Sequence, residues 1–157
     1  MTNIETLHKI SLGMIREQDI APQYANIVGF VSFIMEFRTI TLGVPRQCGK
    51  TKYLLELKKK ISSLMFVYNR LTAEYCYKMD PGGSRSNIVS FDNMDSIQRQ
   101  LRGFKSMGLK YSVFLIDEYS FMKEDQVRDF KLLLSELKSN DMLSEDFYVL
   151  RLGTPVI

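Results

Sequence analysis

The chain of 157 residues is poor in the residue types that build disulfide scaffolds and metal centres. Its two cysteines, Cys48 and Cys76, are too few for a disulfide framework, and their spacing fits no metal motif. The one histidine, His8, has no ligand partner in the sequence and is expected on the surface of a helix. Reduced cysteines are typical of a reducing compartment, so the expected location is the cytoplasm.

Long apolar runs are also missing. The most hydrophobic stretch, residues 27–37, is too short to span a bilayer and contains Glu36. The chain opens with Asn3 and Glu5 rather than with a basic start and an apolar block, so no signal peptide is expected. The sequence predicts no membrane association, and its net charge of +3 permits contact with nucleic acid without requiring it.

The most informative motif directly follows a short apolar run. Residues 44–51 read Val-Pro-Arg-Gln-Cys-Gly-Lys-Thr. A strand, a loop ending in Gly-Lys-Thr and then a helix form a phosphate-binding loop, because backbone N–H groups and the helix dipole attract phosphate. Gly49 would let the backbone approach closely, Lys50 would reach the β and γ phosphates, and the Thr51 hydroxyl would hold Mg²⁺. Val44 stands where the usual pattern has its first glycine, so a surface turn that caps a helix stays a competing interpretation.

A pair of carboxylates ends a second apolar run. Residues 113–116 are Val-Phe-Leu-Ile, which is typical of a strand buried on both faces, and Asp117 and Glu118 follow. Ligands of open parallel sheets bind at the carboxyl ends of the strands. Asp117 would bind Mg²⁺ through water, and Glu118 would polarise the water that attacks the γ phosphate. The competing interpretation is an acidic pair in the first turn of the next helix.

Apolar periodicity divides the chain into alternating helices and strands. Helices are expected at 3–17, 23–37, 50–62, 72–79, around 97–108 and around 127–137. Strands are expected at 39–44, 64–68, 87–91, 111–117 and 147–152. The alternation predicts one α/β domain over 1–157, in which a mostly parallel five-stranded sheet lies between two layers of helices. Residues 1–37 would form a helical N-terminal extension.

Three motifs resemble the ATPase domain of the large terminase subunit of tailed phages, a helicase-like P-loop NTPase. Residues 45–51 are similar to its deviant phosphate loop, small-Arg-Gln-x-Gly-Lys-Thr. Residues 114–118 are similar to its second motif, and 152–155 resemble its coupling motif. Gln23 resembles the upstream glutamine that reads the adenine edge. The resemblance covers roughly residues 23–155.

The resemblance implies a three-layer, RecA-like fold of the catalytic-glutamate class, with another strand between the loop strand and the carboxylate strand. It implies ATP and Mg²⁺ as ligands and Glu118, Arg46 and Lys50 as the catalytic group, with Arg46 on the γ phosphate in cis. Thr51 and Asp117 would hold the metal. Thr154 would sense hydrolysis. The nucleotide-binding residues would be Gln23, Pro45, Arg46, Gln47, Cys48, Gly49, Lys50 and Thr51.

A terminase large subunit continues into a further ATPase subdomain and a nuclease, whereas this sequence ends shortly after the coupling motif. The expected function is ATP hydrolysis on double-stranded DNA or a nucleoprotein partner, in the host cytoplasm if the chain comes from a phage. The chain would then be a free-standing phage or mobile-element ATPase, one subunit of a split motor, or a relic. The expected partners are double-stranded DNA and either further copies of the chain or a separate motor subunit. The alternative is a slow nucleotide-binding switch or assembly factor. A small-molecule kinase is disfavoured by Glu118 and by the lack of an arginine-rich lid.

Overall fold

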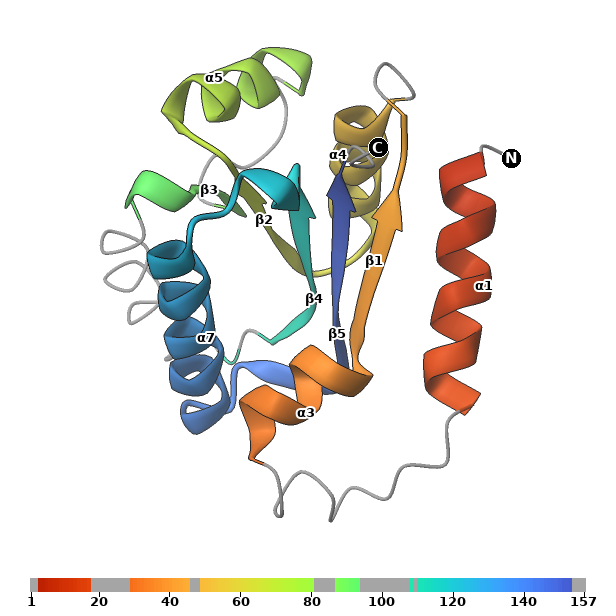
Figure 1. The fold of residues 1–157 in the computed structure, drawn as a ribbon, viewed down its shortest axis with the longest axis vertical. Helices are drawn as coiled ribbons and strands as arrows, with labels where there is room; N and C mark the ends of the chain where they lie inside the picture. Colours follow the sequence, from red (N-terminus) through yellow and green to blue (C-terminus); the bar gives the residue numbers. More distant parts are fainter. Residues whose placement is uncertain are drawn as a thin grey trace.

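Five parallel strands form one sheet in the computed structural model, which describes residues 3–17, 29–45, 49–80, 87–93, 108 and 110–153. The strands are β1 (Thr39–Gly43), β2 (Ser63–Val67), β3 (Ile88–Ser90), β4 (Tyr111–Asp117) and β5 (Leu143–Gly153). Their order is β1-β5-β4-β2-β3, and the arrowheads of β1, β4 and β5 point to the same edge in Figure 1. The predicted five-stranded α/β sheet is confirmed, as is the strand expected between the loop strand and the carboxylate strand, which is β5.

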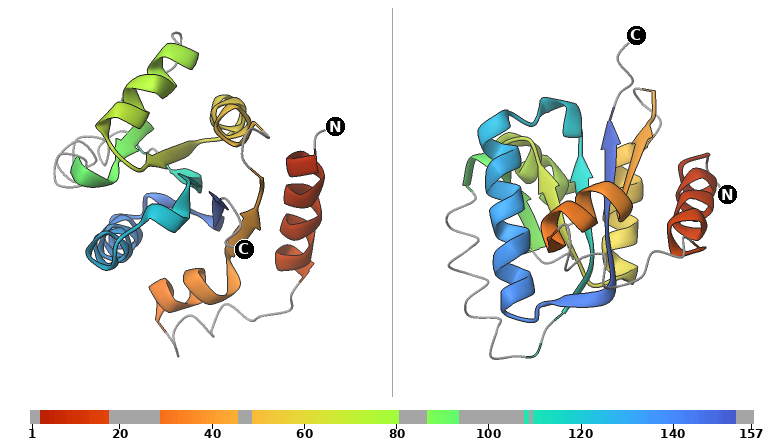
Figure 2. Two further views of the ribbon diagram at one scale, coloured as in Figure 1. Left: turned by 45° about the horizontal axis from the view of Figure 1, so that its top comes forward. Right: turned by 60° about the horizontal axis from the view of Figure 1, so that its bottom comes forward.

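Helices cover both faces of the sheet. They are α1 (Asn3–Glu17), α3 (Phe30–Phe37), α4 (Lys50–Lys60), α5 (Arg70–Met79) and α7 (Glu124–Ser139), with short 3-10 turns η2 (Phe91–Asn93) and η4 (Tyr119–Phe121). One face carries α3 and α7, and the other carries α1, α4 and α5 (Figure 2). Among the described residues, no helix combines the length and the apolar character needed to cross a bilayer.

Each face of the sheet has its own hydrophobic core, because successive side chains of a strand point to opposite faces. In β2, Leu64 and Phe66 join the core beneath α3 and α7, whereas Met65 and Val67 join the core beneath α1, α4 and α5. The same alternation runs along β4 from Val113 and along β5 from Phe147. Burial on both faces explains why the central strands have continuous apolar runs.

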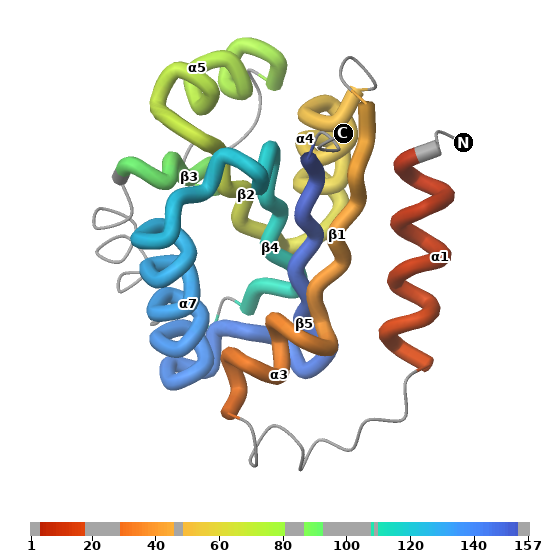
Figure 3. Tube along the Cα trace, in the orientation of Figure 1, coloured from red at the N-terminus to blue at the C-terminus, as the bar shows by residue number. Residues whose placement is uncertain are grey.

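The element bounds follow the prediction closely where hydrophobic patterns are strong. The helix at 3–17 and the strand at 111–117 are found at the predicted bounds. The last strand begins at Leu143 rather than at residue 147, because Leu143 pairs with Tyr111 of β4 before the apolar run starts. Of the helix predicted at 23–37 the described part begins at Phe30, and the helix predicted around 97–108 falls outside the described residues apart from Gly108. Figure 3 traces the course of the chain from α1 to β5.

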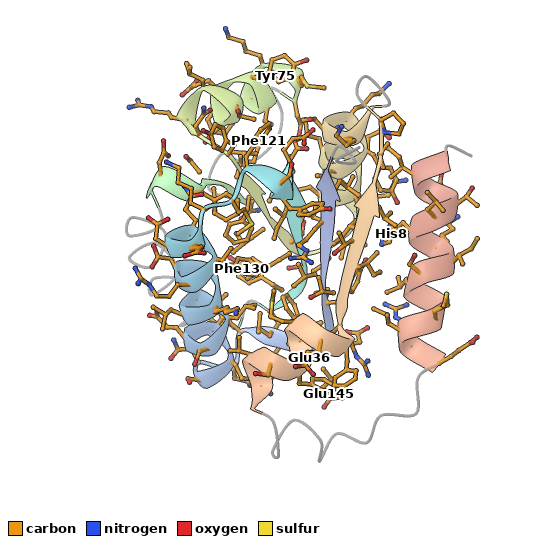
Figure 4. The ribbon with its side chains drawn as sticks, in the orientation of Figure 1. His8, Glu36, Tyr75, Phe121, Phe130 and Glu145 are labelled. Carbon is orange, nitrogen blue, oxygen red and sulfur yellow. The ribbon has the colours of Figure 1, made fainter. Side chains whose placement is uncertain are left out.

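The expectation that His8 lies on the surface is wrong. His8 is 4% exposed, on the side of α1 that faces the sheet (Figure 4). Its Nδ1 lies 2.6 Å from the Tyr53 hydroxyl of α4, and its Nε2 lies 2.9 Å from the Tyr148 hydroxyl of β5. Burial, followed by the charge of Arg16, lowers the pKa of His8. His8 therefore fastens α1 to the rest of the fold.

Candidate functional site

The predicted phosphate loop, residues 44–51, starts at the carboxyl end of β1 and ends at Thr51, the second residue of α4. Val44 extends the pairing beyond β1, since its N–H donates to the Gly153 carbonyl of β5 at 2.8 Å. Gly49 is left-handed, with φ of 77°, and directly precedes α4. A Cβ built on Gly49 would meet nothing within 4 Å, so in this structure the glycine is required by its conformation and not by close packing.

Lys50 begins α4 but points inward. It is 7% exposed, and its Nζ donates to the Val44 carbonyl at 3.3 Å. The same Nζ lies 3.0 Å from Oε1 of Glu118. A turn that merely capped a surface helix would leave its lysine in water, so the burial of Lys50 argues against that interpretation.

Thr51 faces the carboxylate strand. Its hydroxyl donates to Oδ2 of Asp117 at 2.7 Å, across 66 residues of sequence. The two predicted metal-binding residues are therefore in direct contact. Because Lys50 meets Glu118 beside them, two consecutive residues of α4 pair with the two consecutive carboxylates that follow the apolar run of β4.

Asp117 is the most deeply buried carboxylate of this group, at 3% exposed. Desolvation raises the pKa of Asp117, and the hydrogen bond from Thr51 and the charge of Lys50 oppose this rise only in part. Its second oxygen, Oδ1, is buried and accepts no hydrogen bond within the described part of the chain. The negative field of Asp117 also contributes, after burial, to raising the pKa of the Cys76 thiol of α5 to about 11.

Glu118 stands at the turn between β4 and η4. Its backbone is left-handed, with φ of 53° and ψ of 56°, which is uncommon for a residue other than glycine. Its side chain is 25% exposed, so the carboxylate is accessible while paired to Lys50. The next long helix, α7, begins only at Glu124. Asp117 and Glu118 therefore do not lie in the first turn of α7, and Glu118, which precedes η4, makes no side-chain capping hydrogen bond to that short turn.

The donor set fits a hard divalent cation. Within the described ranges no cluster of three or more His, Cys, Asp or Glu side chains forms a metal-ligand group. Mg²⁺ does not need one, because it binds through one or two protein oxygens and takes its other ligands from water and phosphate. The unpartnered Oδ1 of Asp117 and the neighbouring Thr51 hydroxyl are oxygen donors of this kind.

The described structure contains only part of the predicted site. It brings Gly49, Lys50, Thr51, Asp117 and Glu118 together at one edge of the sheet, and it includes Pro45, which is exposed at the start of the loop. Five predicted residues lie outside the described residues, namely Gln23, Arg46, Gln47, Cys48 and Thr154.

Two neighbours of the site, Tyr119 and Arg151, were not predicted from the sequence, whereas Gly153 falls within the predicted coupling motif at 152–155. The Tyr119 ring packs against Gly153 and beneath the guanidinium of Arg151. Tyr119 directly follows the carboxylate pair, which is the one signal in the sequence that could have drawn attention to it. Neither periodicity nor spacing could have shown which residues of β5 it meets.

No protein-family model matches the sequence, and a search of curated proteins gives no match.

Proposed function

We propose that this chain binds ATP together with Mg²⁺ and hydrolyses the γ phosphate, as a P-loop NTPase of the catalytic-glutamate class. One observation carries the proposal. Thr51 pairs with Asp117 and Lys50 pairs with Glu118 where the start of α4 meets the carboxyl end of β4. Chemistry on a triphosphate needs a cation, a metal-binding oxygen pair and a carboxylate close together, and these four side chains provide them.

Lys50 and Glu118 would each change partners during the reaction. In the structure the Lys50 ammonium is held by Glu118 and by the Val44 carbonyl. Contact with the β and γ phosphates would draw Lys50 away from Glu118, because phosphate oxygens carry more negative charge than one carboxylate. The released Glu118 would then orient and polarise the attacking water.

Thr51 and Asp117 would hold Mg²⁺ through their oxygens. When bound, Mg²⁺ supplies positive charge that offsets the charge on the phosphate oxygens. Asp117 must be ionised for this role, which its raised pKa opposes in the absence of a cation. Arg46 would add a guanidinium at the γ phosphate, and Thr154 would respond to hydrolysis. Gln23 would contact the adenine.

The second candidate function is a nucleotide-binding switch that hydrolyses slowly. The resting contact between Lys50 and Glu118 favours it, since both side chains are occupied until a ligand separates them. The rate of ATP hydrolysis distinguishes a motor ATPase from a slow switch. A motor ATPase should be stimulated strongly by double-stranded DNA, whereas a switch should turn over slowly with or without it.

The Lys50→Met variant tests the proposal. Methionine keeps most of the buried stem but removes the charge. ATP affinity should fall roughly 10–100-fold, because a charge-assisted hydrogen bond contributes about 1.5–3 kcal/mol. Lys52→Met is the matched control, because Lys52 is exposed on the same helix, and it should bind ATP like the wild type. Unchanged ATP affinity in a folded Lys50→Met protein would overturn the proposal.

An exposed aromatic pair lies beside the site. The rings of Tyr68, after β2, and Phe121, in η4, have centroids 5.2 Å apart, and both side chains are exposed. Phe121 lies at the edge of the sheet that bears the site (Figure 4). If a DNA or protein partner stimulates turnover from this edge, Tyr68→Ala should reduce the stimulation and leave the basal rate unchanged.

A further inference from the structure

The Tyr119 ring occupies space that only a glycine leaves open. A Cβ built on Gly153 would lie 2.5 Å from Cε1 and 2.7 Å from Cδ1 of Tyr119, well inside the contact distance of real carbon atoms. Gly153 is the last residue of β5 and has no positive φ, so its backbone would accept other residues. The aromatic ring, and not the conformation, therefore requires glycine at this position.

The same ring is held by a second residue of β5. The Cζ atom of Arg151 lies 5.2 Å from the centroid of Tyr119, within the range of a cation–π contact. The guanidinium is itself fixed, because its Nε and Nη2 both donate to Oγ1 of Thr41 on β1, at 3.0 and 2.8 Å. Arg151 and Gly153 lie two residues apart and so face the same side of the sheet. Together they form a seat for the ring.

This seat belongs to a closed ring of contacts around the candidate site. The Gly153 carbonyl accepts from the Val44 N–H, and the Val44 carbonyl accepts from Lys50 Nζ. Lys50 pairs with Glu118, and Tyr119 is the next residue of the chain. The circuit joins the ends of the adjacent strands β1, β5 and β4, so it connects the Tyr119 ring with the pair formed by Glu118 and Lys50.

Glu118 needs such a restraint. A left-handed conformation at a residue other than glycine costs about 1–2 kcal/mol and persists only where the surroundings enforce it. One restraint is the 3.1 Å hydrogen bond from the Phe121 N–H to the Glu118 carbonyl, which closes η4. The seated ring of Tyr119 is another, because it anchors the peptide that leaves Glu118.

We propose that Tyr119 is a positioning residue for triphosphate hydrolysis and that Gly153 leaves the space in which its ring is held. Tyr119 holds the backbone of Glu118 left-handed and so directs the Glu118 carboxylate toward the place where water attacks. Neither Tyr119 nor Gly153 touches the nucleotide. This inference rests on the proposed function, since it assigns a task to a carboxylate of the same site.

The test separates turnover from binding. Tyr119→Leu removes the ring, and Gly153→Ala displaces it. Each should lower kcat for ATP about tenfold or more, since misplacing a reacting group by about 1 Å can cost 10²-fold. The affinity for a non-hydrolysable ATP analogue should change less than about threefold, because Lys50 and Thr51 remain. Tyr119→Phe keeps the ring and should restore a rate close to that of the wild type.

A double variant tests whether the two residues act through one contact. If they do, Tyr119→Leu/Gly153→Ala should be no slower than the slower single variant, because contacting residues are not additive. Tyr75→Leu and Gly13→Ala are the matched controls. Tyr75 is exposed on α5, and a Cβ on Gly13 meets nothing within 4 Å, so both should keep the wild-type kcat.

The outcomes distinguish this inference from the proposed function. Absence of both ATP binding and turnover in the wild type overturns the proposed function, and the inference with it. Wild-type turnover together with an unchanged kcat in Tyr119→Leu and Gly153→Ala overturns the inference alone. If Tyr119→Leu does not fold, Gly153→Ala decides by itself. A fall in analogue affinity as large as the fall in kcat also overturns it, because that pattern indicates general damage to the site.

Discussion

Glu118→Gln is expected to separate two roles of one carboxylate, the resting partner of Lys50 and the group that orients water. Glutamine keeps the length of the side chain and an oxygen that accepts a hydrogen bond, but it loses the charge. Without the charge it polarises water poorly, so turnover should fall about 10²–10⁴-fold. The same change should strengthen ATP binding, because Lys50 leaves a weaker partner when it moves to the phosphates.

The size of this gain follows from the resting contact. A hydrogen bond to a charged group contributes about 1.5–3 kcal/mol, and the 3.0 Å contact is of this kind. The 25% exposure of Glu118 brings the pair toward the lower limit, through screening by solvent. Since glutamine keeps part of the bond, about 1 kcal/mol should be released, or about fivefold in ATP affinity.

The assay combines calorimetric titration with ATP and Mg²⁺ and a single-turnover measurement of phosphate release. Glu124→Gln is the matched control, because Glu124 is exposed in the first turn of α7, and it should match the wild type in both measurements. Wild-type turnover in Glu118→Gln would remove the carboxylate from the reaction. Slow turnover with weaker ATP binding would refute the reasoning about the resting pair.

Two further predictions concern buried titratable groups. Because desolvation raises the pKa of Asp117, the folded state keeps this proton to higher pH than the unfolded state, and stability falls as the pH rises through that interval. Asp117→Asn should therefore raise Tm at about pH 8 but not at about pH 4. The same variant should no longer be stabilised by Mg²⁺ and ATP. A lower Tm of Asp117→Asn at pH 8 would contradict this account. The pKa of His8 is lowered, so its contribution to stability is present above the unfolded value of 6.5 and is lost as the pH falls toward the folded value. His8 is the one histidine of the sequence, so His8→Gln removes this titration. When the pH is lowered from about 7.5 to about 5.5, the free energy of unfolding measured by denaturant titration should therefore fall less in His8→Gln than in the wild type. An equal fall in both proteins would mean that groups other than His8 cause the pH dependence.

The sequence predicts the sheet well because its central strands are buried on both faces. The continuous apolar run predicts both ends of β4 correctly, and helical periodicity predicts both ends of α1 correctly. The prediction fails at the start of β5, where Ser144, Glu145 and Asp146 interrupt the apolar pattern although the backbone is already extended. Leu143 pairs with Tyr111 and Tyr148 pairs with Val113, so these three residues lie in an irregular part of the β4–β5 ladder, which leaves no hydropathy signal.

The site is predictable in its parts and not in its contacts. Motif spacing identifies Lys50, Thr51, Asp117 and Glu118, but it does not show that they form two pairs across the sheet edge. His8 illustrates the same limit, since its partners lie 45 and 140 residues away in the sequence. A helical pattern gives the spacing of side chains along one element, whereas the partner of each side chain depends on the tertiary fold.

The energetic cost of this sheet edge is itself an argument for a functional site. Asp117 is buried with one oxygen unpartnered, Glu118 has a left-handed backbone, and Lys50 is withdrawn from water. Each of these arrangements lowers stability or contributes little to it, and sequences selected for folding alone have simpler ways to end a strand and start a helix. Strained and desolvated groups persist where the binding of a ligand offsets their energetic cost, and they cluster at functional sites for that reason. Lys50, Thr51, Asp117 and Glu118 adjoin one another, and three of these four side chains are strained or desolvated. This concentration fits the proposed site, in which a bound phosphate and its cation would be the stabilising partner.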